Sequence, residues 1–600
     1  MNRPTRNAVL AVGYLAIVVA IVAARSAPAE GYEVSIYAAT PTPTWIGLGT
    51  ALAIALWLAL RARGIDQAVA VGLGSLAVTT IVGLPLVRGY RFLGKGDGLT
   101  HLGWTRDIVD GALLPIELFY PGVHGLATVI HAIGGFEIEQ ATQLAALLVF
   151  VPFVVFVPLV VRAIAGDPLV TGCAAVLAWC VLPINNVATH MGVHTNSNAL
   201  FFVPVVLFAL VAYLSRRSTL DRLPFGLSAY GVVLVVTGLG LLVIHPQQMV
   251  NVVAILAVVG TLQWLVRSRR PEHPIATQPT IYAYTVVLGT AFLVWSTTNE
   301  RFRDALGGLA TGLATAEIGG DETVDQHETS LEAIGGSVTE LFVLLFLVST
   351  VVAAVGGLYV LWTWLGRSDL SPDGRSHVTY LGVSLVPLAG IFAVYFFGTG
   401  TMAFRQVGFL FVVLTILGAV GLGSAAGWLG TRTSAVGVRS LLSLALAACL
   451  VLSLATVFAS PLIYDPTQHV SEAHYSGYET AFETGQDDHA YAGLGYAVHR
   501  YHDGIHGVES VEGHSVQLTG WGDGTVDPDA FNDGAVEELY DEEEDEYYVV
   551  VTAYDTSREF DVYRELHYEP GGLEDLESNP RVNKYVENDE FVLYEVRLDE

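Results

Sequence analysis

The chain has 600 residues, of which 52% are hydrophobic and only 14% are charged. This composition excludes a soluble multidomain protein and indicates a polytopic membrane protein. The net charge of −29 arises in the last part of the chain, because residues 461–600 hold 35 acidic and 6 basic side chains while residues 1–460 hold 23 of each. We therefore predict a membrane domain at 1–460 and an acidic soluble domain at 461–600.

Thirteen apolar stretches are long enough to cross a membrane, since a spanning helix needs about 17–25 residues. They lie at 8–24, 44–61, 66–87, 140–163, 168–185, 198–214, 225–244, 248–266, 280–296, 340–363, 378–398, 404–427 and 441–460. The run 121–134 is interrupted by proline and glycine, so we expect it to lie along the membrane face or dip into it. The predicted fold class is a polytopic α-helical membrane protein.

Arginine recurs in alternate loops, at 61–64, 162–167, 215–222, 267–273, 366–377 and 430–440. Short cytoplasmic loops carry the excess of lysine and arginine, so this pattern predicts a cytoplasmic N-terminus in the cell membrane. Loops 88–139 and 297–339 and the C-terminal domain are then extracellular. The polar loop 297–339 is predicted to form a mobile lid or a helix on the membrane surface.

The acidic tail has a mixed pattern of elements. Helices are predicted at 468–484 and 487–503, and strands at 546–554 and 590–598 around a helix at 557–566, which gives a small α/β domain. Lysine occurs only twice, at Lys95 and Lys584, against 27 arginines. Such an acidic, lysine-poor surface resembles proteins of salt-loving archaea, where high salt screens self-repulsion.

The segment 88–139 gathers charged and aromatic residues between two apolar stretches. Asp97 and His101 are four residues apart, which places them on one face of a helix beginning near Gly98. Arg88, Arg91 and Lys95 precede them in an outside loop, against the arginine bias of the other loops. One interpretation is an anionic partner, such as a lipid headgroup or phosphate. The other is an interfacial anchor with Asp97 as a helix N-cap.

Taken with the stretch Tyr120-Pro121-Gly122-Val123-His124, this loop resembles the membrane glycosyltransferases of the C-type (GT-C) superfamily. The resemblance covers about residues 66–430 and implies a multi-span enzyme that takes sugar from a polyprenyl phosphate. It implies for Asp97 the role of general base or of support for a metal, with His101 as neighbour or alternative. The chain differs from the usual pattern in two extra preceding spans and in lacking an adjacent acidic pair at Asp97.

Other outside segments supply candidate binding residues. Arg405 is the one charge of the short loop 398–406, and it is expected to bind phosphate or to be an interfacial arginine. His124, His245 and Gln248 join Arg405, Lys95 and Arg91 as candidate substrate-binding residues. His190, His194 and His245 are weak candidates for a divalent metal ion, because no carboxylate motif accompanies them; polar lining of a sugar or acceptor site is the alternative.

The functional prediction is a glycosyltransferase that moves a sugar to a glycan, lipid or protein acceptor on the outer face. Its expected partners are a lipid-linked sugar donor and membrane lipids, with no nucleic acid. A transporter or flippase for lipid-linked sugars, or for another anionic solute, is the main alternative, and a non-catalytic membrane scaffold is the third. A transporter should carry charged residues inside its spans, which are nearly free of charge here.

Overall fold

The computed structural model describes residues 2–94, 96–215, 228–300, 302–303, 307, 335–398, 400–486, 489–495, 498–509, 525–540 and 546–598. Three features singled out in the sequence fall at least partly outside these residues. They are Lys95, most of the predicted lid at 297–339 and most of the arginine-containing loop 215–222.

Ten helices among the described residues are long and apolar enough to cross a membrane. They are α1 (Arg3–Arg25), α3 (Thr42–Ala59), α4 (Ile65–Val82), α8 (Ile138–Ala165), α10 (Thr195–Leu214), α12 (Pro246–Arg269), α18 (Leu347–Trp364), α19 (Pro372–Gly398), α20 (Gly400–Arg432) and α21 (Ala435–Leu454). Three shorter helices coincide with the other predicted spans: α9 (Pro168–Trp179), α11 (Ala229–Ile244) and α14 (Tyr282–Thr298). Every predicted span therefore contains a helix.

The interrupted run after residue 120 forms α7 (Gly122–Gly134), a helix of 13 residues. At 1.5 Å per residue it is about 20 Å long, shorter than the hydrocarbon core of a bilayer. It ends at Gly135, which adopts the left-handed conformation that favours glycine. Short helices α2 (Ile36–Ala39), α5 (Leu84–Val87), α13 (Pro274–Thr277) and α17 (Val338–Leu345) connect the longer ones.

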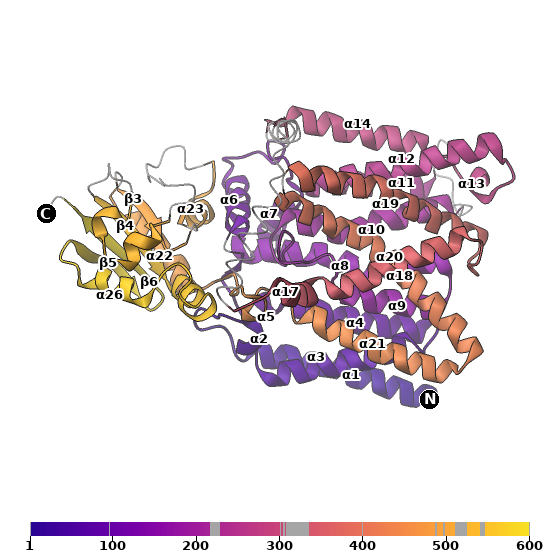
Figure 1. The fold of residues 1–600 in the computed structure, drawn as a ribbon, viewed down its shortest axis with the longest axis horizontal. Coiled ribbons are helices and arrows are strands. Elements are labelled where there is room, and N and C mark those ends of the chain that lie inside the picture. The colour runs from indigo at the N-terminus through magenta and orange to yellow at the C-terminus, as the bar shows by residue number, and fades with distance from the viewer. Residues whose placement is uncertain are drawn as a thin grey trace.

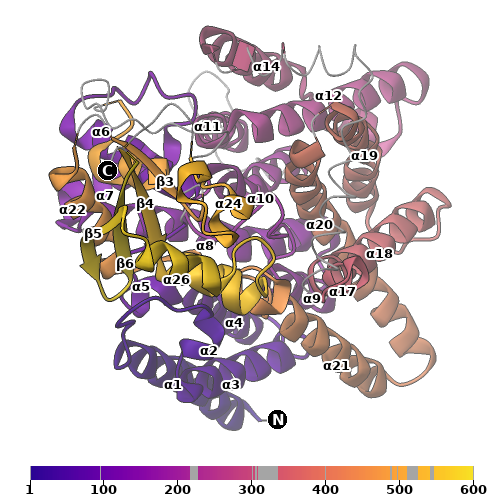
Figure 2. The same ribbon diagram turned by 60° about the vertical axis from the view of Figure 1, so that its left-hand side comes forward.

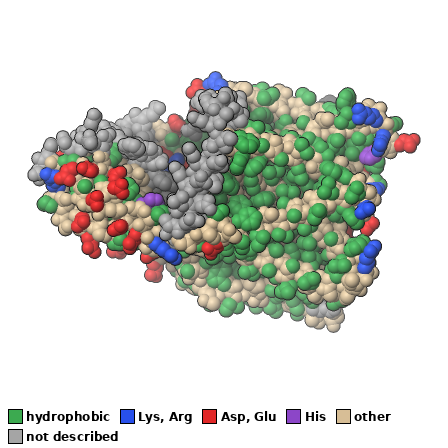
Figure 3. Space-filling view, viewed as in Figure 1, with side chains coloured by type: hydrophobic (Ala, Val, Ile, Leu, Met, Phe, Trp, Pro, Cys, Tyr) green, Lys and Arg blue, Asp and Glu red, His purple; other side chains and the backbone are tan. Residues whose placement is uncertain are grey.

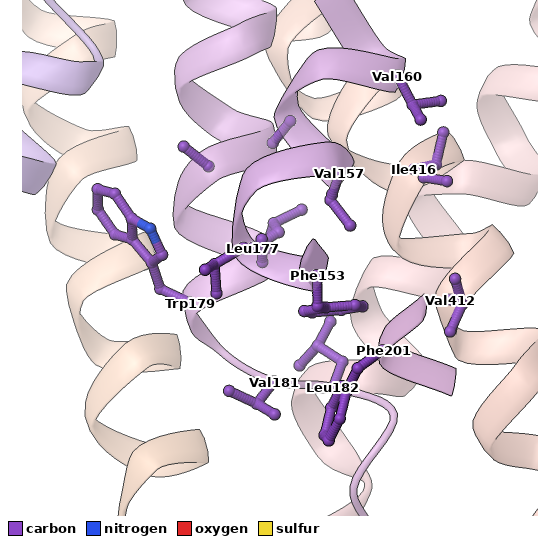
Figure 4. Packing of buried hydrophobic residues seen from close by; sticks show 14 of the residues in the cluster. Phe153, Val157, Val160, Leu177, Trp179, Val181, Leu182, Phe201, Val412 and Ile416 are labelled. Atoms are coloured by element: carbon purple, nitrogen blue, oxygen red, sulfur yellow. The ribbon is translucent and has the colours of Figure 1, made fainter. Parts of the chain in front are cut away.

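The core of the helical body forms where α8, α9, α10 and α20 meet, as Figure 4 shows. Phe153 and Phe201 are fully buried, and their rings pack at a centroid distance of 5.6 Å. Trp179 is also fully buried, and its indole N–H donates to the hydroxyl of Ser75 on α4. Helices that are apolar on nearly every face can interlock in this way because lipid covers the outer faces.

The outside of the helical body is broadly apolar, as Figure 3 shows. Exposed residues include Leu15, Val236, Leu358 and Leu444 on four different helices, each more than 60% exposed. A soluble monomer does not expose apolar surface on this scale, so the helices form a membrane-embedded body. Lysine and arginine side chains gather at the end of the body remote from the sheet (Figure 3).

The arginine-containing loops lie at that remote end as far as the structure describes them, where Figure 1 places the N-terminus and α13. Arg61, after α3, donates to Ser443 at the start of α21. Ser215, after α10, lies 3.0 Å from His377 of α19, and Gln278 after α13 donates to Asp373 of the same helix. The alternation of loops predicted from arginine therefore corresponds to a physical separation of the two ends.

Beyond α21, the C-terminal region (residues 461–598) contains a four-stranded sheet in the order β3-β4-β6-β5, seen side by side in Figure 2. Strand β3 (Ala490–Gly493) runs parallel to β4 (Glu546–Thr552), while β6 (Phe591–Arg597) is antiparallel to both β4 and β5 (Val582–Asn588). The helical elements are η3 (Pro461–Ile463), α22 (Glu472–Thr484), α23 (Val498–His506), α24 (Pro528–Asn532), η5 (Val536–Glu538), α25 (Ala553–Thr556), η6 (Ser557–Val562) and α26 (Pro570–Ser578).

Two predictions for this region were wrong in part. The stretch 487–503 was expected to be one helix, but 490–493 is a buried strand, and α23 begins only at Val498. The helix expected at 557–566 is a single wide turn, η6, that ends at Val562. The predicted strands at 546–554 and 590–598 are present as β4 and β6.

The C-terminal region is joined to the outer loops of the membrane body. Strand β1 (Phe92–Leu93) pairs with β2 (His469–Val470), and the backbone N–H of Gly94 donates to the carbonyl of Gln468 at 2.9 Å. The N–H of Thr467 donates to the carbonyl of Val34 in the first outer loop. These bonds hold the sheet against α6 (Asp97–Asp110), the helix that carries the first candidate site residues.

Candidate functional site

Helix α6 packs directly on α23 of the C-terminal region. Gly103 makes this possible, because a Cβ there would lie 2.3 Å from the carbonyl oxygen of Asp503. Asp107 is fully buried and accepts hydrogen bonds from the backbone N–H groups of Val508 and Glu509 at 2.8 and 3.0 Å. The position of α6 is therefore set by residues about 400 positions later in the chain.

Asp97 is the first residue of α6, and its side chain makes no capping hydrogen bond. The alternative interpretation of Asp97 as an N-cap is therefore wrong. One Asp97 carboxylate oxygen lies 3.1 Å from the Arg500 guanidinium of α23, and its side chain is 51% exposed. Arg500 also donates to Thr100, whose hydroxyl donates to Asp503. Burial raises the pKa of the Asp503 carboxyl.

His101 is buried one turn after Asp97, in a cluster of aromatic rings. Its Nδ1 lies 3.1 Å from Nε2 of His124, whose Nδ1 lies 3.2 Å from the carbonyl oxygen of Tyr120. Trp104 and Tyr120 pack around the His101 ring. Burial, followed by the neighbouring His124, lowers the pKa of His101 well below its usual value, and burial lowers the pKa of His124 to about 4. Both imidazoles are neutral at pH 7.

His124 reaches His101 because α7 starts at a close contact with α11. A Cβ at Gly122 would lie 3.0 Å from the backbone of Ile244, so glycine lets the two helices approach. The next residue, His245, stacks on Tyr120 with ring centroids 5.3 Å apart and an angle of 11° between planes. The stretch 120–124 thus connects α6, α7 and the α11–α12 junction.

His190 and His194 lie on the loop before α10, with rings 5.6 Å apart. Nδ1 of His194 lies 2.7 Å from the hydroxyl of Ser197. Burial lowers the pKa of His190 to about 4, while the carboxylate of Asp97 opposes that shift. Burial and the charges of His190 and Arg405 also lower the pKa of His194. These electrostatic effects place His190 and His194 in the same polar group as Asp97 and Arg405.

Arg405 lies in the second turn of α20 and is partly exposed. Its positive charge contributes to lowering the pKa of His245, which burial takes to about 3, and also acts on His101. No carboxylate among the described residues forms an ion pair with Arg405, although other buried or half-buried arginines at this end have one. The end of the body next to the C-terminal region therefore holds a guanidinium that acts electrostatically on buried histidines and forms no ion pair with a described carboxylate.

Gln248 was expected to line the site, but it is fully buried in a chain of amides that links three helices. It bonds to Asn196 of α10 and to Asn251 of α12, and Asn251 exchanges two hydrogen bonds with Gln406 of α20 at 3.0 and 2.9 Å. These hydrogen bonds join α10, α12 and α20 through buried amide side chains.

The arginines of segment 88–139 form ion pairs with carboxylates of the same chain. Arg88 pairs with Glu33, and Arg91 lies 3.0 Å from Glu139 and 3.7 Å from Glu472. Arg106 also pairs with Glu139. The lipid or phosphate partner expected for Arg88 and Arg91 is therefore replaced by internal carboxylates. Lys95, the third basic residue of this group, lies outside the described residues.

The candidate metal ligands do not form a metal site. Within the part of the chain that the structure describes, no group of three or more histidine, cysteine, aspartate or glutamate side chains is placed to hold an ion. His245 stacks on Tyr120, while His190 and His194 meet edge to face.

The site brings together residues that the sequence suggested separately. They lie in one group at the end of the helical body next to the C-terminal region: Asp97, His101, His124, His190, His194, His245 and Arg405. Arg500, Thr100 and Asp503 were not anticipated, because no local pattern shows that α23 returns to α6. A cavity of about 310 Å³, lined by Val71, Val155, Leu159 and Arg162, lies towards the opposite end and is not part of this site.

No protein-family model and no curated protein sequence matches the chain. Several solved structures are similar to it. The Archaeoglobus fulgidus oligosaccharyltransferase complex with zinc and sulfate has a TM-score of 0.45 and 14% identity, over 85% of this chain and 71% of its own. ArnT from Cupriavidus metallidurans bound to undecaprenyl phosphate has a TM-score of 0.44 and 12% identity, over 92% of this chain and 98% of its own. TM-scores below 0.5 describe a loose likeness, so the chemistry considered below rests on the residues of this chain.

Proposed function

We propose that the protein is an integral membrane glycosyltransferase that moves a sugar from a polyprenyl phosphate to an acceptor on the outer face of the membrane. The observation that carries this proposal is that the charge of Arg405 acts on the buried histidines His101, His190 and His194, and that of Asp97 on His190, at one end of the helical body. The reaction needs a cation for the departing phosphate, a proton acceptor and access from lipid.

Arg405 is the group that we propose binds the phosphate. Placing a guanidinium at the edge of an apolar body, without a carboxylate partner among the described residues, costs free energy unless an anionic ligand binds to it. It can donate to two phosphate oxygens at once, which suits a lipid phosphate better than a point charge does. Its stabilising effect grows during transfer, because negative charge develops on the phosphate oxygen as the sugar leaves.

The placement of the polar groups favours chemistry on one side of the membrane over transport. Asp97, His101, His190, His194 and Arg405 come from segments that meet at the end next to the C-terminal region. A transporter needs polar groups near the middle of the membrane and access from both sides in turn. The long apolar helices that the structure describes carry few charged residues in their membrane-spanning parts.

We also propose an orientation in the membrane and an environment for the protein. The arginine-rich end is cytoplasmic and the C-terminal region is extracellular, following the loop bias. The acidic surface of this region suits an archaeal cell envelope in high salt, because salt screens its self-repulsion. ArnT is similar to this chain and its structure was solved with undecaprenyl phosphate; for this protein the donor class is part of our proposal.

The test is sugar transfer by the purified full-length protein in proteoliposomes at high salt. The donors are short-chain dolichyl phosphates carrying radiolabelled mannose or glucose, and the acceptor is a cell-envelope glycan extract from a strain that lacks the protein. Wild-type protein should release dolichyl phosphate and label the extract. Arg405→Met should lower kcat/KM by about 10²–10³-fold, since it removes a charge-assisted contact to the leaving group.

Arg405→Lys should recover part of the loss, because an ammonium keeps the charge without the fork of donors. Arg162→Met is the matched control, because Arg162 lies at the end of the helical body remote from Arg405. This variant should transfer sugar at the wild-type rate. The proposal is overturned if wild-type protein turns over neither donor, or if Arg405→Met and Arg162→Met behave alike.

A further inference from the structure

Two histidines and one backbone carbonyl form a chain of hydrogen bonds that fixes where the His101 proton lies. Nδ1 of His124 lies 3.2 Å from the carbonyl oxygen of Tyr120. A carbonyl only accepts, so Nδ1 of neutral His124 carries the proton and its Nε2 is a lone pair. That lone pair is 3.1 Å from Nδ1 of His101, which must therefore be the donor.

The remaining nitrogen of His101, Nε2, is then a lone pair held in a fixed direction. It makes no hydrogen bond among the described residues and is not one of the fully enclosed polar atoms. Trp104 and Tyr120 pack around the ring at centroid distances of 5.4 and 5.8 Å, so the imidazole cannot turn freely. A buried base whose other nitrogen is oriented by a second group is the arrangement that nucleophile activation requires.

Resting on the proposed function, we propose that Nε2 of His101 accepts the proton of an acceptor hydroxyl, and that His124 and the Tyr120 carbonyl position it. His101 is the catalytic residue in this account, and His124 is a positioning residue. The inference deepens the proposed function by naming the acceptor chemistry: the acceptor reacts through a hydroxyl group of a sugar, a lipid or a protein side chain.

The step balances as follows for a donor with its sugar C1 bonded to phosphate oxygen. The acceptor oxygen forms a bond to C1 while the bond from C1 to the phosphate oxygen breaks, and its electron pair stays on the phosphate. The hydroxyl proton passes to Nε2 of His101. The imidazolium that forms still donates from Nδ1 to the His124 lone pair, which disperses the positive charge.

Asp97, which the superfamily resemblance implies as the base, has a different environment. Its carboxylate is paired with Arg500 at 3.1 Å, so one of its oxygens is already engaged by a guanidinium. It is also half exposed, whereas His101 is buried among rings. We therefore assign Asp97 a structural role at the edge of the site, where its ion pair with Arg500 links α6 to the C-terminal region.

The test uses transfer kinetics of the full-length protein with the same dolichyl phosphate donors. His101→Gln should lower kcat by about 10²–10⁴-fold, the range for loss of a general base. His124→Phe keeps the ring volume but cannot accept from His101, so kcat should fall by about 10²-fold while KM changes less than threefold. His124→Gln can accept and donate in the same directions and should stay within tenfold of the wild-type kcat.

His131→Phe is the matched control on α7 and should not change kcat, because the one side-chain bond of His131 among the described residues is to the carbonyl of Phe136, just after that helix. Melting curves of all variants separate misfolding from lost chemistry. The inference is overturned if His124→Phe and His124→Gln lose activity equally while both fold, or if His101→Gln retains kcat within threefold. It is equally overturned if Asp97→Asn loses more activity than His101→Gln. A wild-type protein without transfer activity would instead refute the proposed function.

Discussion

Glu139→Gln should loosen the C-terminal region from the membrane body. The Glu139 side chain is only 4% exposed and lies 3.0 Å from Arg91 and 3.1 Å from Arg106, whose side chains are 28% and 21% exposed. These two arginines reach the C-terminal region, since Arg91 lies 3.7 Å from Glu472 and Arg106 donates to the hydroxyl of Tyr475. Removing one partner of a buried ion pair costs about 3–5 kcal/mol. Both arginines keep some contact with water and glutamine keeps one oxygen acceptor, so we expect about 2 kcal/mol. A change of that size raises the open population about 30-fold.

Hydrogen exchange at the Gly94 amide measures this opening, since that N–H donates to Gln468 only while β1 and β2 are paired. Its exchange rate should rise about 30-fold in Glu139→Gln, following the population of the open state. Glu137→Gln is the control, because Glu137 is exposed two residues earlier and makes no capping bond. A rise of less than threefold in Glu139→Gln would refute this account of the docking.

Three further predictions concern stability. Burial holds the pKa of His124 and His190 at about 4 and that of His245 at about 3, below the usual 6.5, so between these values the unfolded chain binds more protons. The free energy of unfolding should be retained above pH 6.5 and should fall towards pH 4 by up to about 1.4 kcal/mol per pH unit for each histidine. A melting temperature that stays flat from pH 7.5 to 4.5 would contradict this. Asp107→Asn should weaken two bonds to backbone N–H groups by about 2 kcal/mol in total, which faster exchange of the Val508 amide would reveal and unchanged exchange would exclude. Gln406→Leu should lower the melting temperature by the equivalent of about 1–3 kcal/mol because it removes both bonds that Asn251 exchanges with Gln406 and leaves the buried Asn251 Oδ1 without that donor. An unchanged melting temperature would argue against the amide chain.

The membrane body could be predicted because hydropathy and loop arginines act locally. A helix in lipid satisfies its own backbone hydrogen bonds, so an apolar stretch of sufficient length specifies a span without knowledge of its neighbours. The short helix α7 could be predicted for the same reason, since proline and glycine limit it on both sides.

The C-terminal region was harder to predict because its elements depend on distant partners. Residues 490–493 are short and apolar, a pattern shared by buried strands and helix segments, and only pairing with β4 decides between them. Strand β5 has several exposed side chains and pairs only with β6, so its sequence lacks the apolar run of a central strand.

The site could be predicted in its residue types but not in its connections. The spacing of Asp97 and His101 placed both on one helix, and the motif at 120–124 indicated His124. Nothing local indicates that His124 contacts His101, or that Arg500 approaches Asp97 from a position about 400 residues later. The partners of Arg88 and Arg91 could not be predicted for the same reason, because the carboxylates that pair with them are distant in sequence.

Binding of short-chain dolichyl phosphate to the purified protein tests the central claim most directly. Equilibrium titration at high salt should give saturable binding to wild-type protein, none with unphosphorylated dolichol, and at least tenfold weaker binding to Arg405→Met. Arg162→Met should bind as wild type does. Equal affinity of wild-type protein and Arg405→Met for dolichyl phosphate would contradict the claim that this end of the helical body binds a lipid phosphate.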